Sequence, residues 1–228
     1  AQAINAVAEA DVEAINGVAK ANVEAINGVS LPAAASGATL WTVVHDDTTV
    51  STAANSDTTS WTAYDSISGN APSSTVDHIA VHYGKDGNGS PRYVCSFEAD
   101  NAELAHSPDP SNGQAWTVVQ NLSNGNTIPC RAFAIAWGNN VWLAIGQMSN
   151  SKGNNVLRST DGASWTAVDV SGVSGIVNTG CYGLAYSGTG SRFFFAQQNR
   201  IYETTDGGQN FNLAHTLLNA NGGDPGDI

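Results

Sequence analysis

A short pattern built around an aspartate recurs along this chain and constrains its fold more than any other feature. The clearest copies are LRSTDGASWTAV at 157–168 and IYETTDGGQNFNLA at 201–214. In each, a small hydroxyl residue stands two positions before Asp, Gly follows, and an aromatic residue opens a strand-like stretch. The Asp carboxylate can accept backbone N–H groups across a turn, and Gly supplies positive φ. The pattern therefore predicts a turn that joins two short strands.

Looser copies occur upstream, at 55–64 (NSDTTSWTAY) and 104–119 (LAHSPDPSNGQAWTVV). The expected role of the pattern is structural, because Asp closes the turn and the aromatic side chain packs into the sheet beneath. The residues expected to build these turns are Ser159, Asp161, Gly162, Trp165, Thr204, Asp206, Gly208, Phe211, Asp57, Trp61, Asp109 and Trp116.

Strand-like segments precede each turn in a regular order. The expected first strands are Ile79–Tyr83, Ile135–Trp137 and Leu184–Tyr186, and the second strands are Tyr93–Phe97, Val141–Gly146 and Arg192–Gln197. A third strand, the turn and a fourth strand follow, with a repeat of just under about fifty residues, as a propeller blade requires. Residues 41–65 supply strand pairs for a fourth unit. The WTVV at Trp41 duplicates the WTVV at Trp116, which suggests an outer strand donated to another blade.

The turn pattern resembles the Asp-box, or BNR repeat, of sialidase-like β-propellers, in which Ser-x-Asp-x-Gly-x-x-Trp joins the third and fourth strands of a blade. The copy at Asp206 matches that spacing, the copy at Asp161 is one residue tighter, and those at Asp57 and Asp109 depart further. The resemblance implies a mainly β fold, with an Asp-box β-propeller-like domain over 41–228. That domain is a minimal propeller, part of a longer one, or one sector of a ring shared between subunits. The motif says little about function, because it occurs in glycosidases, receptors and assembly factors.

Residues 1–33 form a separate region of three consecutive eleven-residue units, AQAINAVAEAD, VEAINGVAKAN and VEAINGVSLPA. Apolar residues follow a 4-4-3 spacing, and eleven residues in three turns keep a helical stripe facing a partner in a right-handed supercoil. We therefore predict a short helical segment that anchors the chain or associates as a trimer. The residues expected to make that contact are Ile4, Val12, Ile15, Val23 and Ile26.

Two dipeptides oppose a continuous helix, Asn16-Gly17 and Asn27-Gly28. Asn-Gly favours a turn, and each Gly costs a helix about 1 kcal/mol. Short helices broken at each Asn-Gly, or a peptide docked on a repetitive partner, are the alternatives. Pro32 and the small residues after it predict a linker over 34–40.

Charge and composition argue against several classes of partner. The chain has 8 Lys and Arg against 20 Asp and Glu, for a net charge of -12, with no basic cluster. This disfavours nucleic acid and anionic membrane surfaces. No apolar run approaches the roughly 20 residues of a membrane span, and no signal peptide is recognisable. The three cysteines lack CxxC spacing, which favours buried free thiols over a disulfide or a metal site: Cys95, Cys130 and Cys181.

For the residues that could form a catalytic or metal site, a structural role is the better-supported interpretation. A sialidase-like site needs three arginines on the substrate carboxylate, but Arg158, Arg192 and Arg200 are expected in or beside outer strands, with Arg92 and Arg131 the only others. Asp86, Asn88 and Ser90 have the alternate-oxygen spacing of a calcium loop, yet Phe97 stands where its Glu belongs, which favours a plain hairpin loop. His78 and His82 are four apart on one expected strand face, without a metal-binding helix motif. The tryptophans are expected to pack in the core rather than to form a sugar platform. We predict no catalytic residue, cofactor or metal ligand.

A self-associating N-terminal repeat, a linker and a polar β domain together suggest a stalk with a display head. The INGVA-type repeat resembles segments in structural proteins of tailed marine bacteriophages, and STDG-x-x-WT repeats are similar to those of phage fibre and decoration proteins. This resemblance implies a virion surface protein that contacts itself, other virion proteins and a host glycan. A glycan- or protein-binding propeller module of a secreted or surface protein is the alternative, and a sialidase-like hydrolase is third.

Overall fold

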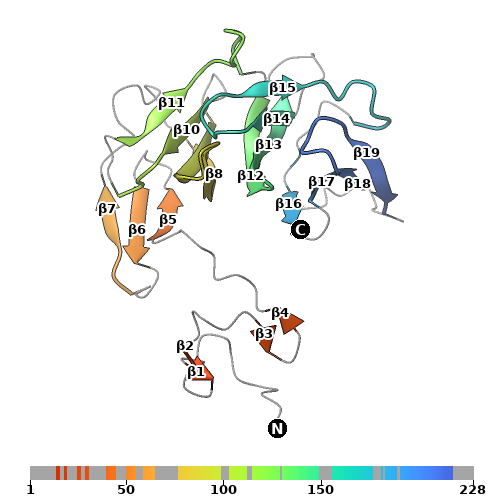
Figure 1. Ribbon diagram of the computed structural model, residues 1–228. Helices are drawn as coiled ribbons and strands as arrows, with labels where there is room; N and C mark the ends of the chain where they lie inside the picture. Colours follow the sequence, from red (N-terminus) through yellow and green to blue (C-terminus); the bar gives the residue numbers. More distant parts are fainter. Residues whose placement is uncertain are drawn as a thin grey trace. The chain divides into compact units, whose positions relative to one another are not determined.

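The computed structural model describes residues 14–15, 18–19, 25–26, 29–30, 40–44, 50–54, 59–64, 77–98, 103–111, 115–128, 130–148, 156–176, 181, 183–188 and 191–217. The chain divides into two units, Ala1–Ala38 and Thr39–Ile228. The described part is mainly β, in antiparallel sheets, and contains no helix (Figure 1). None of its segments is therefore a helix long and apolar enough to cross a membrane.

The first unit contains two small hairpins rather than the expected helix. Strand β1 (Ala14–Ile15) pairs with β2 (Val18–Ala19), and β3 (Ala25–Ile26) pairs with β4 (Val29–Ser30). In sequence, the two residues between the strands of each pair are Asn-Gly, the dipeptide that two-residue hairpin loops prefer. The helix prediction is therefore wrong at these residues, because local turn chemistry prevails over the apolar spacing. Of the predicted contact residues, Ile15 and Ile26 lie in the hairpins, while Ile4, Val12 and Val23 lie outside the described residues.

The described residues of the second unit form three four-stranded sheets and one three-stranded sheet, each with its strands in sequence order. The first sheet is β5 (Leu40–Val44), β6 (Val50–Ala54) and β7 (Thr62–Tyr64). The second is β8 (Asp77–Lys85), β9 (Pro91–Glu98), β10 (Glu103–Ser107) and β11 (Thr117–Val119). The third is β12 (Cys130–Gly138), β13 (Val141–Met148), β14 (Val156–Ser159) and β15 (Thr166–Val168). The fourth is β16 (Gly183–Ser187), β17 (Arg192–Gln197), β18 (Arg200–Thr204) and β19 (Asn212–Thr216).

The four-stranded units predicted from the repeat are present, but the strand at Trp41 was assigned wrongly. Strand β5 pairs with β6 inside its own sheet, with Trp41 opposite Ala53, and is not donated elsewhere. Leu40 lies opposite Ala54, the last residue of β6, as the second strands of the other sheets pair with the residues that end β10, β14 and β18: Tyr93, Trp142 and Phe193. The first sheet therefore supplies the second, third and fourth strands of the repeat. Within the described residues, the sheets do not close into a ring.

Neighbouring sheets contact one another through their first strands. Strand β12 lies against β8 and β9 of the second sheet and against β16 of the fourth, while β5 contacts β8. Two glycines allow the close approach. A Cβ on Gly84 would stand 2.3 Å from Trp137 Cγ, and one on Gly138 would stand 2.3 Å from Tyr186 Cγ. An aromatic residue of each later first strand thus packs directly on the backbone of the one before.

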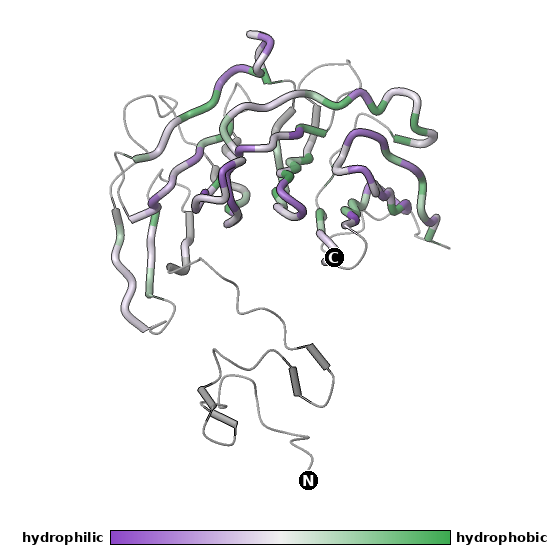
Figure 2. The backbone as a smooth tube through the Cα atoms, viewed as in Figure 1, coloured by the Kyte–Doolittle hydropathy of each residue, from purple (hydrophilic) through white to green (hydrophobic). Residues whose placement is uncertain are grey.

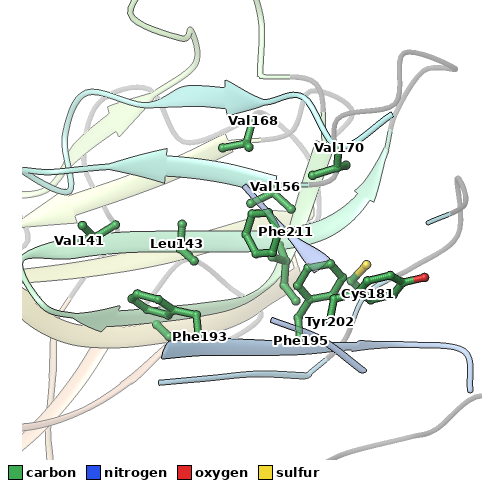
Figure 3. Packing of buried hydrophobic residues seen from close by; sticks show 12 residues of the cluster. Val141, Leu143, Val156, Val168, Val170, Cys181, Phe193, Phe195, Tyr202 and Phe211 are labelled. Atoms are coloured by element: carbon green, nitrogen blue, oxygen red, sulfur yellow. The ribbon is translucent and has the colours of Figure 1, made fainter. Parts of the chain in front are cut away.

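Three buried clusters fill the spaces between consecutive sheets. The cluster between the third and fourth sheets includes Leu143, Val156, Phe193, Tyr202 and Phe211 (Figure 3). Hydrophobic and hydrophilic residues are mixed along the described strands (Figure 2). Such mixing is expected, because successive residues of a strand face opposite sides of the sheet. The unit is thus held together by side chains from both faces of its inner sheets.

Cysteine and histidine positions refine the expectations from sequence. Cys95 and Cys181 are free and buried, as predicted, and burial raises the pKa of the Cys95 thiol; the side chain of Cys130 lies outside the described part. Strand β8 has a bulge between His78 and Ala80, which interrupts the alternation behind the predicted shared face of His78 and His82; the His78 side chain lies outside the described part. The His82 ring lies edge-on to Trp142, and burial lowers its pKa.

Candidate functional site

The three Asp-centred turns of the four-stranded sheets share a hydrogen-bonding plan. In the third sheet, Asp161 Oδ1 accepts the N–H groups of Ala163 and Ser164 at 2.8 and 2.7 Å and the Ser159 hydroxyl at 2.9 Å. Ser159 Oγ in turn accepts the N–H of Gly162 at 2.8 Å. The turn is closed by side chains, because the loop backbone has no ladder partners of its own.

The fourth sheet repeats this plan with one extra residue. Asp206 Oδ1 accepts the N–H groups of Gln209 and Asn210 at 2.9 and 3.0 Å and the Thr204 hydroxyl at 2.8 Å, and Asn210 Nδ2 donates to Oδ2 at 2.8 Å. Desolvation opposes ionisation of Asp206, but the hydrogen bonds from Asn210, Thr204 and Gln209 outweigh it and lower its pKa to about 2. Gly208 has a φ of 81°, and Gly162 in the third sheet has a φ of 73°.

The second sheet keeps the start of the pattern. Asp109 N–H donates to Ser107 Oγ at 3.0 Å, and Asp109 Oδ1 accepts from the N–H and the hydroxyl of Ser111 at 2.9 and 2.6 Å. Asp57 of the first sheet lies outside the described residues. The carboxylates of Asp109, Asp161 and Asp206 are thus committed to their own turns.

The aromatic residue after each turn is buried in the three four-stranded sheets but exposed in the first sheet. Trp116, Trp165 and Phe211 directly precede their fourth strands and are 4%, 0% and 5% exposed. Trp61 directly precedes β7 in the same way but is 45% exposed, which differs from the expected core packing. The buried aromatics belong to clusters with residues of the preceding sheet, such as Val50 for Trp116 and Val94 for Trp165. In Thr39–Ile228, no sheet precedes the first one among the described residues.

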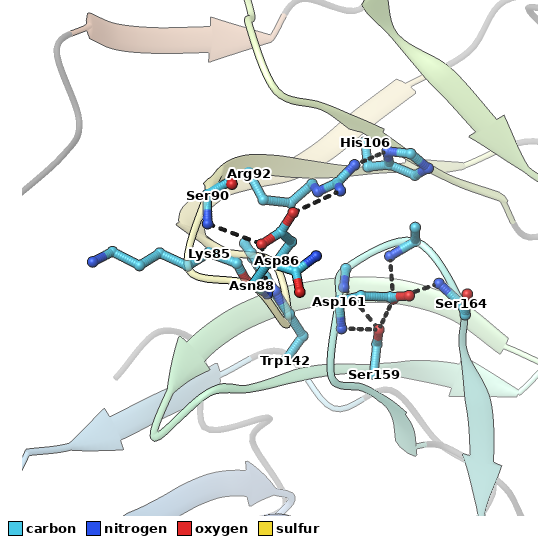
Figure 4. Close-up of polar contacts among 12 residues, drawn as sticks. Lys85, Asp86, Asn88, Ser90, Arg92, His106, Trp142, Ser159, Asp161 and Ser164 are labelled. Atoms are coloured by element: carbon cyan, nitrogen blue, oxygen red, sulfur yellow. Dashed lines mark hydrogen bonds and ion pairs between the residues drawn. The ribbon is translucent and has the colours of Figure 1, made fainter.

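A polar cluster of the second sheet is connected to β13 of the third and lies near the Asp161 turn (Figure 4). Arg92 Nη1 donates to His106 Nδ1 at 2.7 Å, and Arg92 Nη2 lies 3.7 Å from Asp86 Oδ2. Asp86 Oδ1 also accepts the N–H groups of Asn88 and Ser90, which makes this loop a hairpin turn closed by its own carboxylate. On the other side, Trp142 Nε1 donates to the Lys85 carbonyl at 2.8 Å. The plain hairpin loop at Asp86 is as the sequence predicts, but its link to His106 and Trp142 was missed, because those residues lie on other strands.

His106 is held neutral in this cluster. Burial lowers its pKa most, and the Arg92 guanidinium adds to the effect, for a value of about 4. A histidine with a pKa below its unfolded value binds a proton more readily when unfolded, so the folded state loses stability as pH falls from about 6.5 towards 4.

We therefore expect His106→Gln to flatten the pH dependence of stability in that window, by about 1 kcal/mol after allowance for solvent screening. Urea unfolding at pH 7 and pH 5 measures this, with His215→Gln as the control on an exposed histidine. Equal pH dependence in the His106 variant and the unsubstituted protein would show that His106 is not the responsible group.

The arginines whose side chains the structure describes do not converge on one point. The described arginines bond separate partners: Arg92 contacts His106, Arg158 Nε donates to the Gly207 carbonyl, Arg192 pairs with Glu203, and Arg200 Nη1 donates to the Gly175 carbonyl. The side chain of Arg131 lies outside the described part. Among the described residues, no group of three or more His, Cys, Asp or Glu side chains is placed to hold a metal ion. No family model matches the chain, and no curated protein shows significant similarity to it.

Proposed function

We propose that this chain is a non-enzymatic virion structural protein of a bacteriophage, serving as a fibre, an appendage or a capsid decoration. Its repeated N-terminal unit anchors or trimerises the chain, and its second unit is a propeller-like head of Asp-box blades displayed at the particle surface. The proposed partners are further copies of the chain, other virion proteins and a host surface glycan. No cofactor enters the proposal.

The observation that carries the proposal is the pairing of two repeats of different kinds in one chain. An eleven-residue repeat fills a separate N-terminal unit, and a four-stranded repeat fills the other. Ile15 and Ile26 occupy equivalent places eleven residues apart, and each is paired with a valine, Val18 or Val29. Two-stranded hairpins this short cannot bury their apolar side chains alone, so repetition favours association with like units or with a repetitive partner.

A non-enzymatic role suits the head, because its described aspartates and arginines make hydrogen bonds that hold its turns and sheets together. The aspartates close turns, and Arg92 and Arg158 contact the turn of the next sheet. Few charged residues and a net charge of -12 fit a soluble display surface better than a nucleic-acid partner.

A variant of the complete chain tests the N-terminal part of this proposal. We expect Ile15→Asn together with Ile26→Asn to reduce the number of copies in the native assembly, because the substitutions remove the repeated apolar contact. Glu13→Gln with Glu24→Gln is the matched control, also eleven residues apart in the same repeats. Sedimentation velocity measures both variants. An assembly unchanged by the asparagine substitutions would contradict association through this unit.

A glycan- or protein-binding propeller module is the second candidate, and the exposed Trp61 ring favours it, because exposed aromatic rings commonly stack on sugars. In that case Trp61→Ala abolishes saturable binding to a glycan array, while the asparagine variant leaves binding intact. A sialidase-like hydrolase is third, and would require turnover of a sialoside that depends on one carboxylate of the head.

A further inference from the structure

The fourth sheet packs one of its faces on the third sheet and leaves the other face partly exposed. Phe193, Phe195 and Tyr202 point into the buried cluster shared with the third sheet (Figure 3). Because successive residues of a strand face opposite sides, Phe194 and Ile201 lie on the other face, called the outer face below. Both are partly exposed, and neither belongs to the three buried clusters found among the described residues. The outer face is therefore partly apolar.

The equivalent faces of the second and third sheets are covered by a neighbouring sheet. By strand register, Phe194 corresponds to Val94 and Leu143, which are each 0% exposed. Val94 Cγ2 lies 3.1 Å from where a Cβ on Gly162 would stand, in the turn of the third sheet. Leu143 Cδ2 lies 2.4 Å from the same point on Gly208, in the turn of the fourth sheet. The position of Phe194 is thus one that a packed surface covers in both other four-stranded sheets.

The charges on the outer face differ from those on the covered faces. Glu203 occupies the position that Arg158 has in the third sheet, opposite the apolar residue of the second strand. Arg158 Nε donates to the Gly207 carbonyl of the docked turn at 2.7 Å, and a carboxylate cannot make that bond. An Asp-centred turn approaching the outer face would also bring its own carboxylate towards Glu203. The outer face therefore does not suit the kind of turn that the second and third sheets receive.

A second copy of the same face supplies matching charges. Arg192 lies beside Glu203 on the outer face, with Nη1 3.3 Å from Oε2, and the two side chains are 50% and 26% exposed. Under two-fold symmetry the same patch meets itself, so a guanidinium of each copy can face a carboxylate of the other. Opposite charges then meet twice, although the whole chain carries a net charge of -12.

We propose that two copies of this chain associate through the outer faces of their fourth sheets about a two-fold axis. Arg192 of each copy faces Glu203 of the other, and the Phe194 and Ile201 side chains are buried between them. A single four-stranded face is smaller than a standard protein interface, so the copies associate at roughly 100 µM rather than at low micromolar concentration. The inference rests on the fourth sheet and not on the proposed function.

Charge-reversed variants of the complete chain test this contact. Arg192→Glu gives an outer face with two carboxylates, and Glu203→Arg gives one with two guanidiniums. Each variant breaks the ion pair within the chain and makes the two-fold contact repulsive, whereas an equimolar mixture restores opposite charges between copies only. Sedimentation equilibrium measures association of each variant and of the mixture. Asp169→Arg is the control for net charge, because Asp169 is exposed after β15 and lies outside the fourth sheet.

We expect each reversed variant alone to associate at least about tenfold more weakly than the unsubstituted chain, and the mixture to recover association to within about threefold. Unchanged association of the reversed variants would overturn the proposal, and so would a loss that mixing does not restore. An equal loss in Asp169→Arg would assign the effect to net charge and overturn it as well.

The same mixture is repeated with Ile15→Asn and Ile26→Asn in both chains, which removes the N-terminal contact. Recovery on mixing in that background reports the outer face alone. Failure of the outer-face contact and failure of the proposed function therefore give different results.

Discussion

Trp165→Ala is expected to lower the free energy of unfolding by about 3–5 kcal/mol, the largest effect of any single substitution in the head. The indole is 0% exposed and belongs to the cluster between the second and third sheets, with Val94, Leu104 and Trp142. Its Nε1 also donates to the Gly162 carbonyl at 3.3 Å. Truncation therefore leaves a cavity at the inter-sheet contact and removes a hydrogen bond inside the turn.

Urea unfolding followed by far-ultraviolet circular dichroism measures this change at fixed protein concentration. Leu213→Ala is the control, because it removes an apolar side chain that is 43% exposed, and we expect a loss below about 1 kcal/mol. Similar losses in both variants would mean that Trp165 does not hold the two sheets together.

Gly208→Ala is expected to destabilise the protein by about 2–4 kcal/mol, because two costs add. Gly208 has a φ of 81°, in the left-handed region that disfavours a side chain. An added Cβ would also stand 2.4 Å from Leu143 Cδ2 in the preceding sheet. The substitution therefore strains the turn and pushes apart the third and fourth sheets.

Gly89→Ala separates the two costs. Gly89 has a φ of 84°, but an added Cβ there meets nothing within 4 Å. The same denaturation experiment should give a loss of about 1 kcal/mol from backbone strain alone. Equal losses at positions 89 and 208 would show that contact with Leu143 contributes nothing.

The parts of the fold that sequence predicts are those fixed by local chemistry. A hydroxyl residue, Asp and Gly at short spacing determine a turn by themselves, so the strands around Asp161 and Asp206 were predictable. The prediction of an N-terminal helix was wrong for the same reason. Asn-Gly favours a hairpin, and this local preference outweighs the eleven-residue apolar spacing.

The contacts between sheets were not predictable in this way. His106 and Arg92 are fourteen positions apart and meet only because β9 and β10 pair, and their cluster reaches the third sheet through Trp142 and Lys85. Trp61 fits the turn pattern as well as Trp116 does, and its exposure depends on the position of its sheet in the series. A residue's position in the repeat predicts its local structure. The burial of its side chain depends on whether another sheet packs against it.

The native mass of the intact chain at low micromolar concentration tests the display-protein account most directly. Three copies of the 23.5 kDa chain give about 70 kDa, the mass expected if the N-terminal unit brings copies together. A mass of one chain across the accessible concentration range would contradict both the N-terminal association and the display role that depends on it.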